Sequence, residues 1–226
     1  MHLLILGRGK TSSQVAEVAA HRRHHVQAID ETENADARAL TPEFLFPFDV
    51  VIDFTTPSAV VPNAEACIRA GKRIVVGTTG WYDQIPRLRE QVLAAKTGFL
   101  YGSNFSIGVN LFFEIAATAA AASKFGYNGQ IFERHHEQKK DAPSGTAITI
   151  QTLIREQGGQ ELEIVSFREG DVVGLHEITF DSANDRIYLC HDAKSRRGFA
   201  EGAVRAAEWL ASKTGFYEFR QIWREL

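Results

Sequence analysis

Short apolar runs alternate with amphipathic stretches along the first hundred residues. The runs are continuous in hydrophobicity, which is typical of strands buried on both faces, and they lie at residues 3–6, 26–29, 50–54, 74–76 and 99–101. Helical spacing occupies three stretches between them, at residues 11–21, 57–70 and 83–96. Strands that alternate with helices predict a parallel sheet with helices on both faces, which is the doubly wound α/β arrangement.

Proline, glycine and a capping residue mark the ends of two of these helices. Pro57 stands in the first turn of the second helix, and Gly71 follows its end. Asp83 is the expected N-cap of the third helix, and Gly98 closes it. These signals support the helical interpretation of both stretches.

The pattern changes near residue 104. A strand is predicted between two helices, in the order 104–123 (helix), 130–136 (strand) and 143–157 (helix). Three more strands follow without helices between them, at residues 161–168, 176–181 and 186–191. Strands in direct succession predict an antiparallel or mixed sheet. A last helix, at residues 199–213, has the alanine-rich character of the first half.

Composition excludes several classes of protein. Hydrophobic residues make up 44% and charged residues 23% of the 226 residues, and no apolar run approaches the ~20 residues of a membrane helix. The net charge of −3 argues against nucleic-acid binding. The chain enters its first strand at once, and Cys67 and Cys190 are far apart, so we expect a cytoplasmic protein with reduced thiols. Any anionic ligand must then be bound by a local basic patch.

A glycine-rich turn joins the first strand to the first helix. It has the form G-x-G-x-x-S and consists of Gly7, Arg8, Gly9, Lys10, Thr11 and Ser12. Glycines at this place let a pyrophosphate approach the helix N-terminus, and Asp30, at the end of the second strand, is placed to accept a hydrogen bond from a ribose hydroxyl. The alternative is a turn that needs glycine only for its geometry. A Walker-type phosphate loop is excluded because Leu4 occupies the position of its first glycine.

We therefore predict a Rossmann-type domain that binds a dinucleotide, formed by residues 1–104 plus 196–226, with an α+β domain inserted at residues 105–195. A second turn, Gly77-Thr78-Thr79-Gly80, directly follows a strand and would lie over the crevice of the sheet. Its hydroxyl residues suit a nicotinamide or a ribose, and an ordinary turn is the equally supported alternative.

The segment richest in reactive side chains is residues 133–147. It brings His135, His136, Lys139 and Lys140 within six positions, shortly before a helix start at Gly145-Thr146. Cations beside a helix N-terminus suit a carboxylate ligand, because backbone N–H groups and the helix dipole both favour negative charge. Histidine also supplies a proton near neutral pH.

Strand periodicity places Ile131, Glu133 and His135 on one face of the predicted strand. Adjacent histidines also occur as surface residues or as hydrogen-bonded core residues, so the pair alone does not decide its role. Zinc would need further ligands at suitable spacing, and none lies nearby in the sequence, so we predict no metal site.

The same segment resembles the signature of the dihydrodipicolinate reductase family, which reads roughly E-x-H-H-x-x-K-x-D-x-P-S-G-T-A. The likeness spans nearly the whole chain, with Ser12 and the short length as departures. Further stretches resemble family motifs in the expected order: Asp53-Phe54-Thr55, Gly77-Thr78-Thr79-Gly80, Asn104-Phe105-Ser106-Ile107-Gly108-Val109-Asn110, Arg168-Glu169-Gly170-Asp171, Val173-Gly174 with His176, and Phe199-Ala200 with Gly202-Ala203 and the following Ala206–Leu210.

The resemblance implies that a small dicarboxylate imine, derived from 4-hydroxy-tetrahydrodipicolinate, is reduced to tetrahydrodipicolinate in diaminopimelate and lysine biosynthesis. It implies NADH or NADPH as the hydride donor and a homotetramer built through the sheet of the inserted domain. Its implied site consists of the acid/base His135 and the proton donor Lys139; the substrate-binding His136, Ser144, Gly145 and Thr146; and cofactor contacts at residues 7–12, Asp30, Gly77, Thr78, Thr79, Gly102, Ser103, Asn104 and Phe105.

Two acids, Asp30 and Glu31, end the second strand and favour NADH, because an acid there repels a 2′-phosphate; Lys10 would offset this if it reaches the phosphate. Two other interpretations stay open. One is a reductase of the same architecture that acts on another small imine or carbonyl. The other is a non-catalytic nucleotide-sensing protein, for which Ser12 is the only support.

Overall fold

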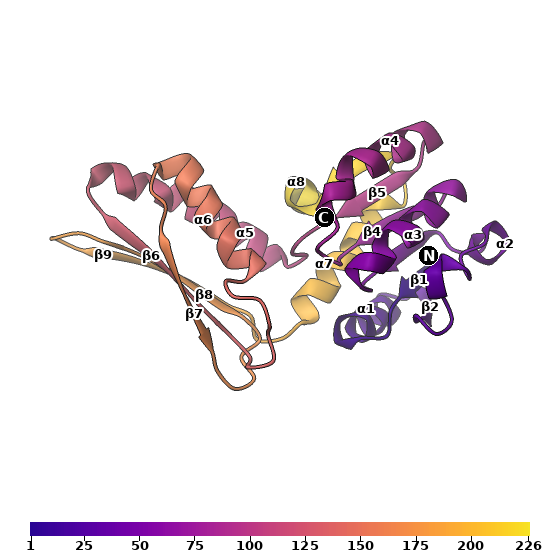
Figure 1. Cartoon of the computed structure of the whole chain (residues 1–226), viewed down its shortest axis with the longest axis horizontal. Coiled ribbons are helices and arrows are strands. Elements are labelled where there is room, and N and C mark those ends of the chain that lie inside the picture. The colour runs from indigo at the N-terminus through magenta and orange to yellow at the C-terminus, as the bar shows by residue number, and fades with distance from the viewer. The chain divides into compact units, whose positions relative to one another are not determined.

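The computed structural model describes residues 1–226, and the chain divides into two compact units (Figure 1). Unit 1 contains Met1–Ser106 and Arg197–Leu226, and unit 2 contains Ile107–Arg196. The sequence-based division placed its cuts after residues 104 and 195. No helix combines the length and the apolar character that a membrane crossing requires.

Six parallel strands form the sheet of unit 1, in the order β10-β5-β4-β3-β1-β2. Their bounds are β1 His2–Leu6, β2 His25–Ile29, β3 Val50–Asp53, β4 Arg73–Val76, β5 Gly98–Tyr101 and β10 Gly215–Glu218. Strands β1, β3 and β4 are almost wholly buried, as their continuous apolar runs predict. The chain order reverses at β1, which has β2 on one side and β3 on the other. Ligands of such sheets bind at the carboxyl ends of the strands beside this reversal.

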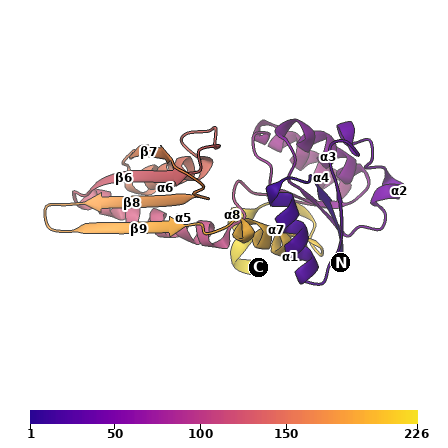
Figure 2. The ribbon, with the colours of Figure 1, turned by 90° about the horizontal axis from the view of Figure 1, so that it is seen from below.

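Helices cover both faces of this sheet (Figure 2). On one face α1 (Lys10–His21) packs against α7 (Arg197–Leu210), and α3 (Pro57–Arg69) with α4 (Ile85–Ala95) covers the other. Glu208 of α7 ties the C-terminal segment to the start of the chain, because it accepts hydrogen bonds from Arg22 and His24, each at 2.8 Å. The Rossmann-type, doubly wound fold is therefore confirmed.

Unit 2 is a mixed four-stranded sheet in the order β7-β6-β8-β9, with α5 and α6 packed on one face (Figure 1). Strands β6 and β7 are parallel, and the other two pairs are antiparallel, which confirms the mixed sheet. The bounds are α5 Ile107–Ala119, β6 Asn128–His135, α6 Gly145–Gly158, β7 Glu163–Arg168, β8 Leu175–Asp181 and β9 Arg186–Asp192.

The structure adds elements that the sequence analysis missed, namely α2 (Pro42–Leu45), β10 and α8 (Phe219–Ile222). Strand β10 completes the sheet by pairing with β5, and the Phe216 ring stacks on Phe99 at 4.7 Å between centroids. Four residues carry too little periodicity to identify a strand, so its existence depends on that pairing.

The predicted helix at residues 104–123 is wrong at both ends. It begins only at Ile107, because the side chain of Asn104 accepts a hydrogen bond from the Ser106 N–H at 2.9 Å and holds a turn. After Ala119 the chain tightens into a 3₁₀ segment, Ala120–Phe125.

The predicted ends of α4 are also wrong. Asp83 lies inside a 3₁₀ turn, and Gln84 is the N-cap. Lys96, in the left-handed region at φ 52°, ends the helix. Gly98 belongs to β5, where a Cβ atom would come within 2.8 Å of the Lys213 carbonyl oxygen.

Candidate active site

The turn between β1 and α1 contains two glycines with different roles. Gly7 has φ +101°, and a Cβ atom there would lie 2.5 Å from the Phe54 carbonyl oxygen, so the fold itself requires glycine. Gly9 is the N-cap of α1, and a Cβ atom there would meet nothing within 4 Å. The absent side chain at Gly9 therefore leaves open space at the positive end of the helix, where a phosphate is favoured.

Ser12 shows why this turn tolerates a serine in place of the third glycine. Its side chain is buried, and its hydroxyl donates a hydrogen bond to the Phe54 carbonyl oxygen at 3.3 Å. Lys10 and Thr11 lie beside it in the first turn of α1. The serine thus fastens α1 to the end of β3.

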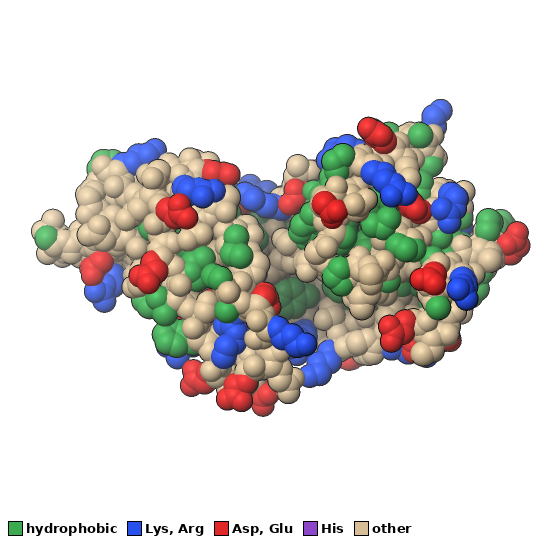
Figure 3. Space-filling view, in the orientation of Figure 1, with side chains coloured by type: hydrophobic (Ala, Val, Ile, Leu, Met, Phe, Trp, Pro, Cys, Tyr) green, Lys and Arg blue, Asp and Glu red, His purple; other side chains and the backbone are tan.

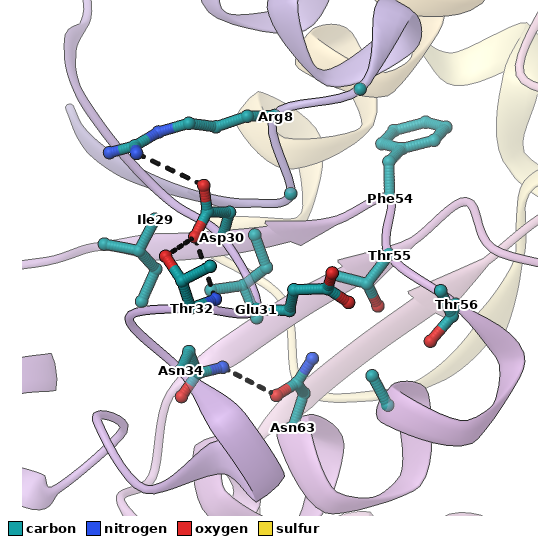
Figure 4. Close-up of a pocket in the computed structure, with 14 residues that line it drawn as sticks. Arg8, Ile29, Asp30, Glu31, Thr32, Asn34, Phe54, Thr55, Thr56 and Asn63 are labelled. Atoms are coloured by element: carbon teal, nitrogen blue, oxygen red, sulfur yellow. Dashed lines mark hydrogen bonds and ion pairs between the residues drawn. The ribbon is translucent and has the colours of Figure 1, made fainter.

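A cavity of about 380 Å³ opens at this end of the sheet (Figure 4). Of the predicted cofactor residues, it is lined by Gly7, Arg8, Gly9 and Asp30. Arg8 lies 3.3 Å from the Asp30 carboxylate and 2.9 Å from Glu33. Hydrogen bonds from the Thr32 hydroxyl and backbone N–H, aided by Arg8, hold the pKa of Asp30 below its usual range. The cavity therefore has an ionised carboxylate on one side and a glycine-led helix start on the other.

A buried polar network supports the floor of this region. Asp53, fully buried at the end of β3, accepts hydrogen bonds from the Thr55 hydroxyl at 2.6 Å and from Asn63 at 2.9 Å. Burial raises the pKa of Asp53, and these hydrogen bonds offset part of the rise. The Thr78 hydroxyl accepts from the Thr55 N–H at 2.8 Å. The network therefore fixes the loops after β3 and β4 to each other.

Lys10, Thr11 and Ser12 do not line this cavity, and neither do the predicted cofactor residues that follow β4 and β5. Gly77 packs directly against Phe54: a Cβ atom there would overlap the Phe54 ring at 2.1 Å, so the ring would have to move. A Cβ atom at Gly102 would come within 2.9 Å of Phe219. Packing thus explains these glycines, and the nucleotide contacts remain predictions for Gly77, Thr78, Thr79, Gly102, Ser103, Asn104 and Phe105.

In unit 2 the predicted chemistry gathers around Glu133 of β6, which is completely buried. Its Oε1 accepts hydrogen bonds from the Ser144 N–H at 3.2 Å and from Arg168 at 3.1 Å. Its Oε2 lies 3.0 Å from His135 Nδ1 and 4.0 Å from His176 Nε2. Burial by itself raises the pKa of Glu133, but the hydrogen bonds outweigh it and lower the pKa to about 2. The carboxylate is therefore ionised at neutral pH.

His135, the candidate acid/base, ends β6 with its ring buried, on the same face as Ile131 and Glu133, as strand periodicity predicted. Burial lowers its pKa to about 4, with Lys139 and Arg168 lowering it further and Glu133 opposing them. The ring packs edge-on against His176 at 5.2 Å, and burial also lowers the pKa of His176 to about 3. Both imidazoles are consequently neutral at pH 7.

The connection from β6 to α6 carries the remaining predicted residues. Ser144 is the N-cap of α6: its hydroxyl accepts from the Ala147 N–H at 3.2 Å and lies 3.2 Å from His176 Nε2. Gly145 is exposed, and a Cβ atom there would meet nothing within 4 Å, whereas Thr146 is half-buried. The capping role explains Ser144, and its place in a substrate site stays a prediction.

Two basic side chains complete this cluster. Lys139 pairs with Asp141 at 2.8 Å, and His136 Nε2 lies 3.2 Å from the Arg196 guanidinium. Figure 3 shows Lys and Arg side chains interspersed with Asp and Glu at this end of unit 2. The structure thus groups His135, His136, Lys139 and the start of α6 at one end of the sheet.

Three members of the cluster received no role from the sequence analysis: Glu133, Arg168 and His176. Strand register brings them together, because Glu133 is directly opposite His176 on β8, and His135 is opposite Arg168 on β7. Sequence spacing does not reveal register between distant strands. Two signals were available: the alternation of β6 puts Glu133 and His135 on one face, and the family motifs include Glu133, Arg168 and His176.

No third metal ligand lies near His135 along the sequence, but the fold brings two further candidate ligands close to it. Glu133, His135 and His176 place their ligand atoms within 4.8 Å of one another. However, the Arg168 guanidinium contacts the same carboxylate, and a dication beside it would be repelled. We therefore interpret the cluster as an acid/base site.

Both units of the chain match models of a known protein family. The model "Dihydrodipicolinate reductase, N-terminus" matches residues 1–105, and "Dihydrodipicolinate reductase, C-terminus" matches residues 108–223. The chain belongs to the dihydrodipicolinate reductase family. The resemblance found in the sequence motifs is thus confirmed.

Similar members of the dihydrodipicolinate reductase family include two proteins named 4-hydroxy-tetrahydrodipicolinate reductase. The one from Christiangramia forsetii is 38% identical over 242 aligned residues, covering 100% of this chain and 99% of the relative. The one from Archaeoglobus fulgidus is 42% identical over 190 residues, covering 75% and 73%. The dipicolinate-bound dihydrodipicolinate reductase from Paenisporosarcina sp. TG-14 shares the fold, with a TM-score of 0.80, 24% identity and coverage of 98% and 99%.

The two glycines of the first turn should separate binding from stability. We expect Gly9→Ala to weaken NADH binding at least about tenfold, because its methyl group occupies the phosphate approach, while the unfolding free energy changes by less than about 1 kcal/mol. Gly7→Ala should cost at least about 1–2 kcal/mol from its left-handed backbone alone. Calorimetric NADH titration and thermal melts measure both; unchanged NADH affinity in Gly9→Ala would contradict the assignment.

Proposed function

We propose that the chain reduces the dihydrodipicolinate-type imine formed from 4-hydroxy-tetrahydrodipicolinate, giving tetrahydrodipicolinate for diaminopimelate and lysine biosynthesis. The observation that carries this proposal is the match of both family models to one chain that keeps the complete segment from Glu133 to Ala147. The curated relatives carry the name of this reductase.

Unit 1 fits a nicotinamide dinucleotide. Gly9 has open space at the helix start, and Asp30 presents an ionised carboxylate to the same cavity. The pyrophosphate would lie against the turn of Gly7 and Gly9, and Asp30 would accept a hydrogen bond from a ribose hydroxyl. When bound, the nicotinamide supplies a hydride, which carries two electrons and one proton.

Unit 2 supplies the second proton and holds the substrate. Gly145 and Thr146, at the N-terminus of α6, would bind one carboxylate, with His136 assisting. In the proton-transfer step an N–H bond of His135 or Lys139 breaks, its electron pair stays on nitrogen, and a C–H bond forms on the substrate ring. His135 is neutral in the empty site. A dianionic substrate beside the ring would favour its charged, proton-donating form, because a nearby negative charge stabilises the imidazolium. Substrate binding thereby prepares its own acid.

One assay tests both the proposed reaction and the proposed proton donors, His135 and Lys139. We expect NADH oxidation when 4-hydroxy-tetrahydrodipicolinate is supplied, and kcat lower by about 10²–10⁴-fold in His135→Ala and in Lys139→Ala. NADH affinity should stay near wild type, because both residues lie in unit 2. Lys124→Ala, at an exposed lysine of unit 2 outside this cluster, is the matched control.

A wild-type protein that leaves NADH unoxidised with this substrate contradicts the proposed function. If Lys139→Ala raises only KM, the lysine anchors a carboxylate and does not donate the proton.

Nucleotide preference should follow Asp30. We expect higher kcat/KM with NADH than with NADPH, because Asp30 repels a 2′-phosphate and, with Glu33, holds Arg8 away from it. Asp30→Ser removes the repulsion and releases Arg8, so the NADPH-to-NADH ratio of kcat/KM should rise about tenfold or more, whereas exposed Asp36→Asn should not change it. Wild-type preference for NADPH would refute this assignment.

We also propose a homotetramer that forms through the outer face of the unit 2 sheet. That face presents Phe167 of β7 and Tyr188 of β9, which are 40% and 54% exposed, beside half-buried Phe132 of β6. Exposed aromatic side chains on a sheet face are typical of subunit contacts.

Light scattering should give the mass of four chains for the wild type and a smaller mass for Phe167→Glu. Phe46→Glu introduces the same charge at a side chain of unit 1 that is 81% exposed, and should stay tetrameric. A monomeric wild-type protein would contradict the proposed homotetramer.

A further inference from the structure

We propose that Glu133 is the positioning residue of this reductase: one carboxylate oxygen sets the tautomer of His135, and the other fixes the first turn of α6. The inference rests on the proposed function, because it names the group that prepares the proton donor. Glu133 acts through His135 and Ser144 and does not itself meet the substrate.

The first oxygen faces the imidazole. Glu133 Oε2 is 3.0 Å from His135 Nδ1, and neither of these two buried atoms forms a well-aligned hydrogen bond. Buried polar atoms in proteins are normally hydrogen-bonded. A small rotation of the imidazole ring would give this oxygen and this nitrogen one hydrogen bond to each other. Catalytic hydrogen bonds are often loosely aligned in empty sites and tighten when the substrate binds.

The opposite edge of the ring is kept open by a glycine. A Cβ atom at Gly174, just before β8, would lie 3.1 Å from His135 Nε2, tighter than ordinary contact. With Nδ1–H donated to Glu133, Nε2 is the nitrogen that exchanges a proton with the substrate. Glu133 therefore faces Nδ1 of the imidazole, and Gly174 lies beside Nε2.

The second oxygen connects the acid to the carboxylate pocket. Glu133 Oε1 accepts from the Ser144 N–H at 3.2 Å and from Arg168 at 3.1 Å, and Arg168 also donates to the Asp141 carbonyl oxygen. Ser144 caps α6, whose first residues are Gly145 and Thr146. A single side chain thus links the position of the proton donor to the position of the helix start.

Charge around His135 gives Glu133 a second effect. Lys139 and Arg168 disfavour the imidazolium, whereas Glu133 favours it and Asp141 adds to this. His176 of β8 also faces the ring, as a neutral imidazole. Glu133 is the larger of the two acidic contributions. Removing its charge should therefore lower the pKa of His135, which a purely structural residue would not do.

The test is Glu133→Gln. Ser144 N–H and Arg168 are both donors, so the amide oxygen will face them and the amide NH₂ group will face Nδ1. This favours the opposite tautomer, with the proton on Nε2. We expect kcat to fall about 10²–10⁴-fold, with the KM for substrate and the NADH affinity within about threefold of wild type. The kcat–pH profile should shift to lower pH.

Nitrogen-15 NMR of His135 supplies the direct readout, with Nδ1 protonated in wild type and Nε2 protonated in Glu133→Gln. Glu156→Gln, on the exposed side of α6, makes the same chemical change away from the cluster and should behave as wild type. Wild-type kcat and an unchanged tautomer in Glu133→Gln overturn the proposal, as does raised KM at unchanged kcat.

A folding failure of the variant does not remove the test, because Nε2–H in the wild-type protein would overturn the proposal alone. If the wild type does not oxidise NADH with the substrate, the proposed function fails, and the tautomer measurement still decides the role of Glu133.

Discussion

The buried carboxylate of Glu133 sets the constraint on which the chemistry of unit 2 depends. An ionised group without solvent must be matched by donors, and the fold provides them from Arg168 of β7 and the backbone N–H of Ser144, the N-cap of α6. The His135 ring of the same strand lies 3.0 Å from the other carboxylate oxygen. Because these partners come from different elements, satisfying one charge also fixes their mutual positions. The acid/base residue and the carboxylate-binding helix start are consequences of that arrangement.

Each unit also contains one helix whose N-terminus is left open by a glycine. Both α1 and α6 begin beside a glycine at which a side chain would meet only open space, Gly9 in one case and Gly145 in the other. The fold does not need glycine at either position, in contrast to Gly7, which packing requires. Two helix N-termini kept open in this way suit the two anions of the proposed reaction, a pyrophosphate and a carboxylate.

Hydrophobic periodicity was enough to predict the parallel sheet, its covering helices and the mixed second sheet, because burial on one or two faces leaves a pattern in the sequence. It missed β10, whose four residues are held by pairing with β5. Motifs identified His135 and Lys139, since both residues lie in one short segment of the sequence. They gave no role to Glu133 or His176, because that pair depends on the register of β6 against β8.

The central claim is that His135 is neutral in the empty site and that a bound dicarboxylate raises the pKa of His135 toward the charged form. NMR titration of its ring protons, without and with dipicolinate, tests this most directly. The account predicts a pKa near 4 in the free protein, well below the usual 6.5, and a rise of about one unit or more with dipicolinate, because an adjacent anion favours the imidazolium. A pKa near 6.5 that dipicolinate leaves unmoved would contradict it.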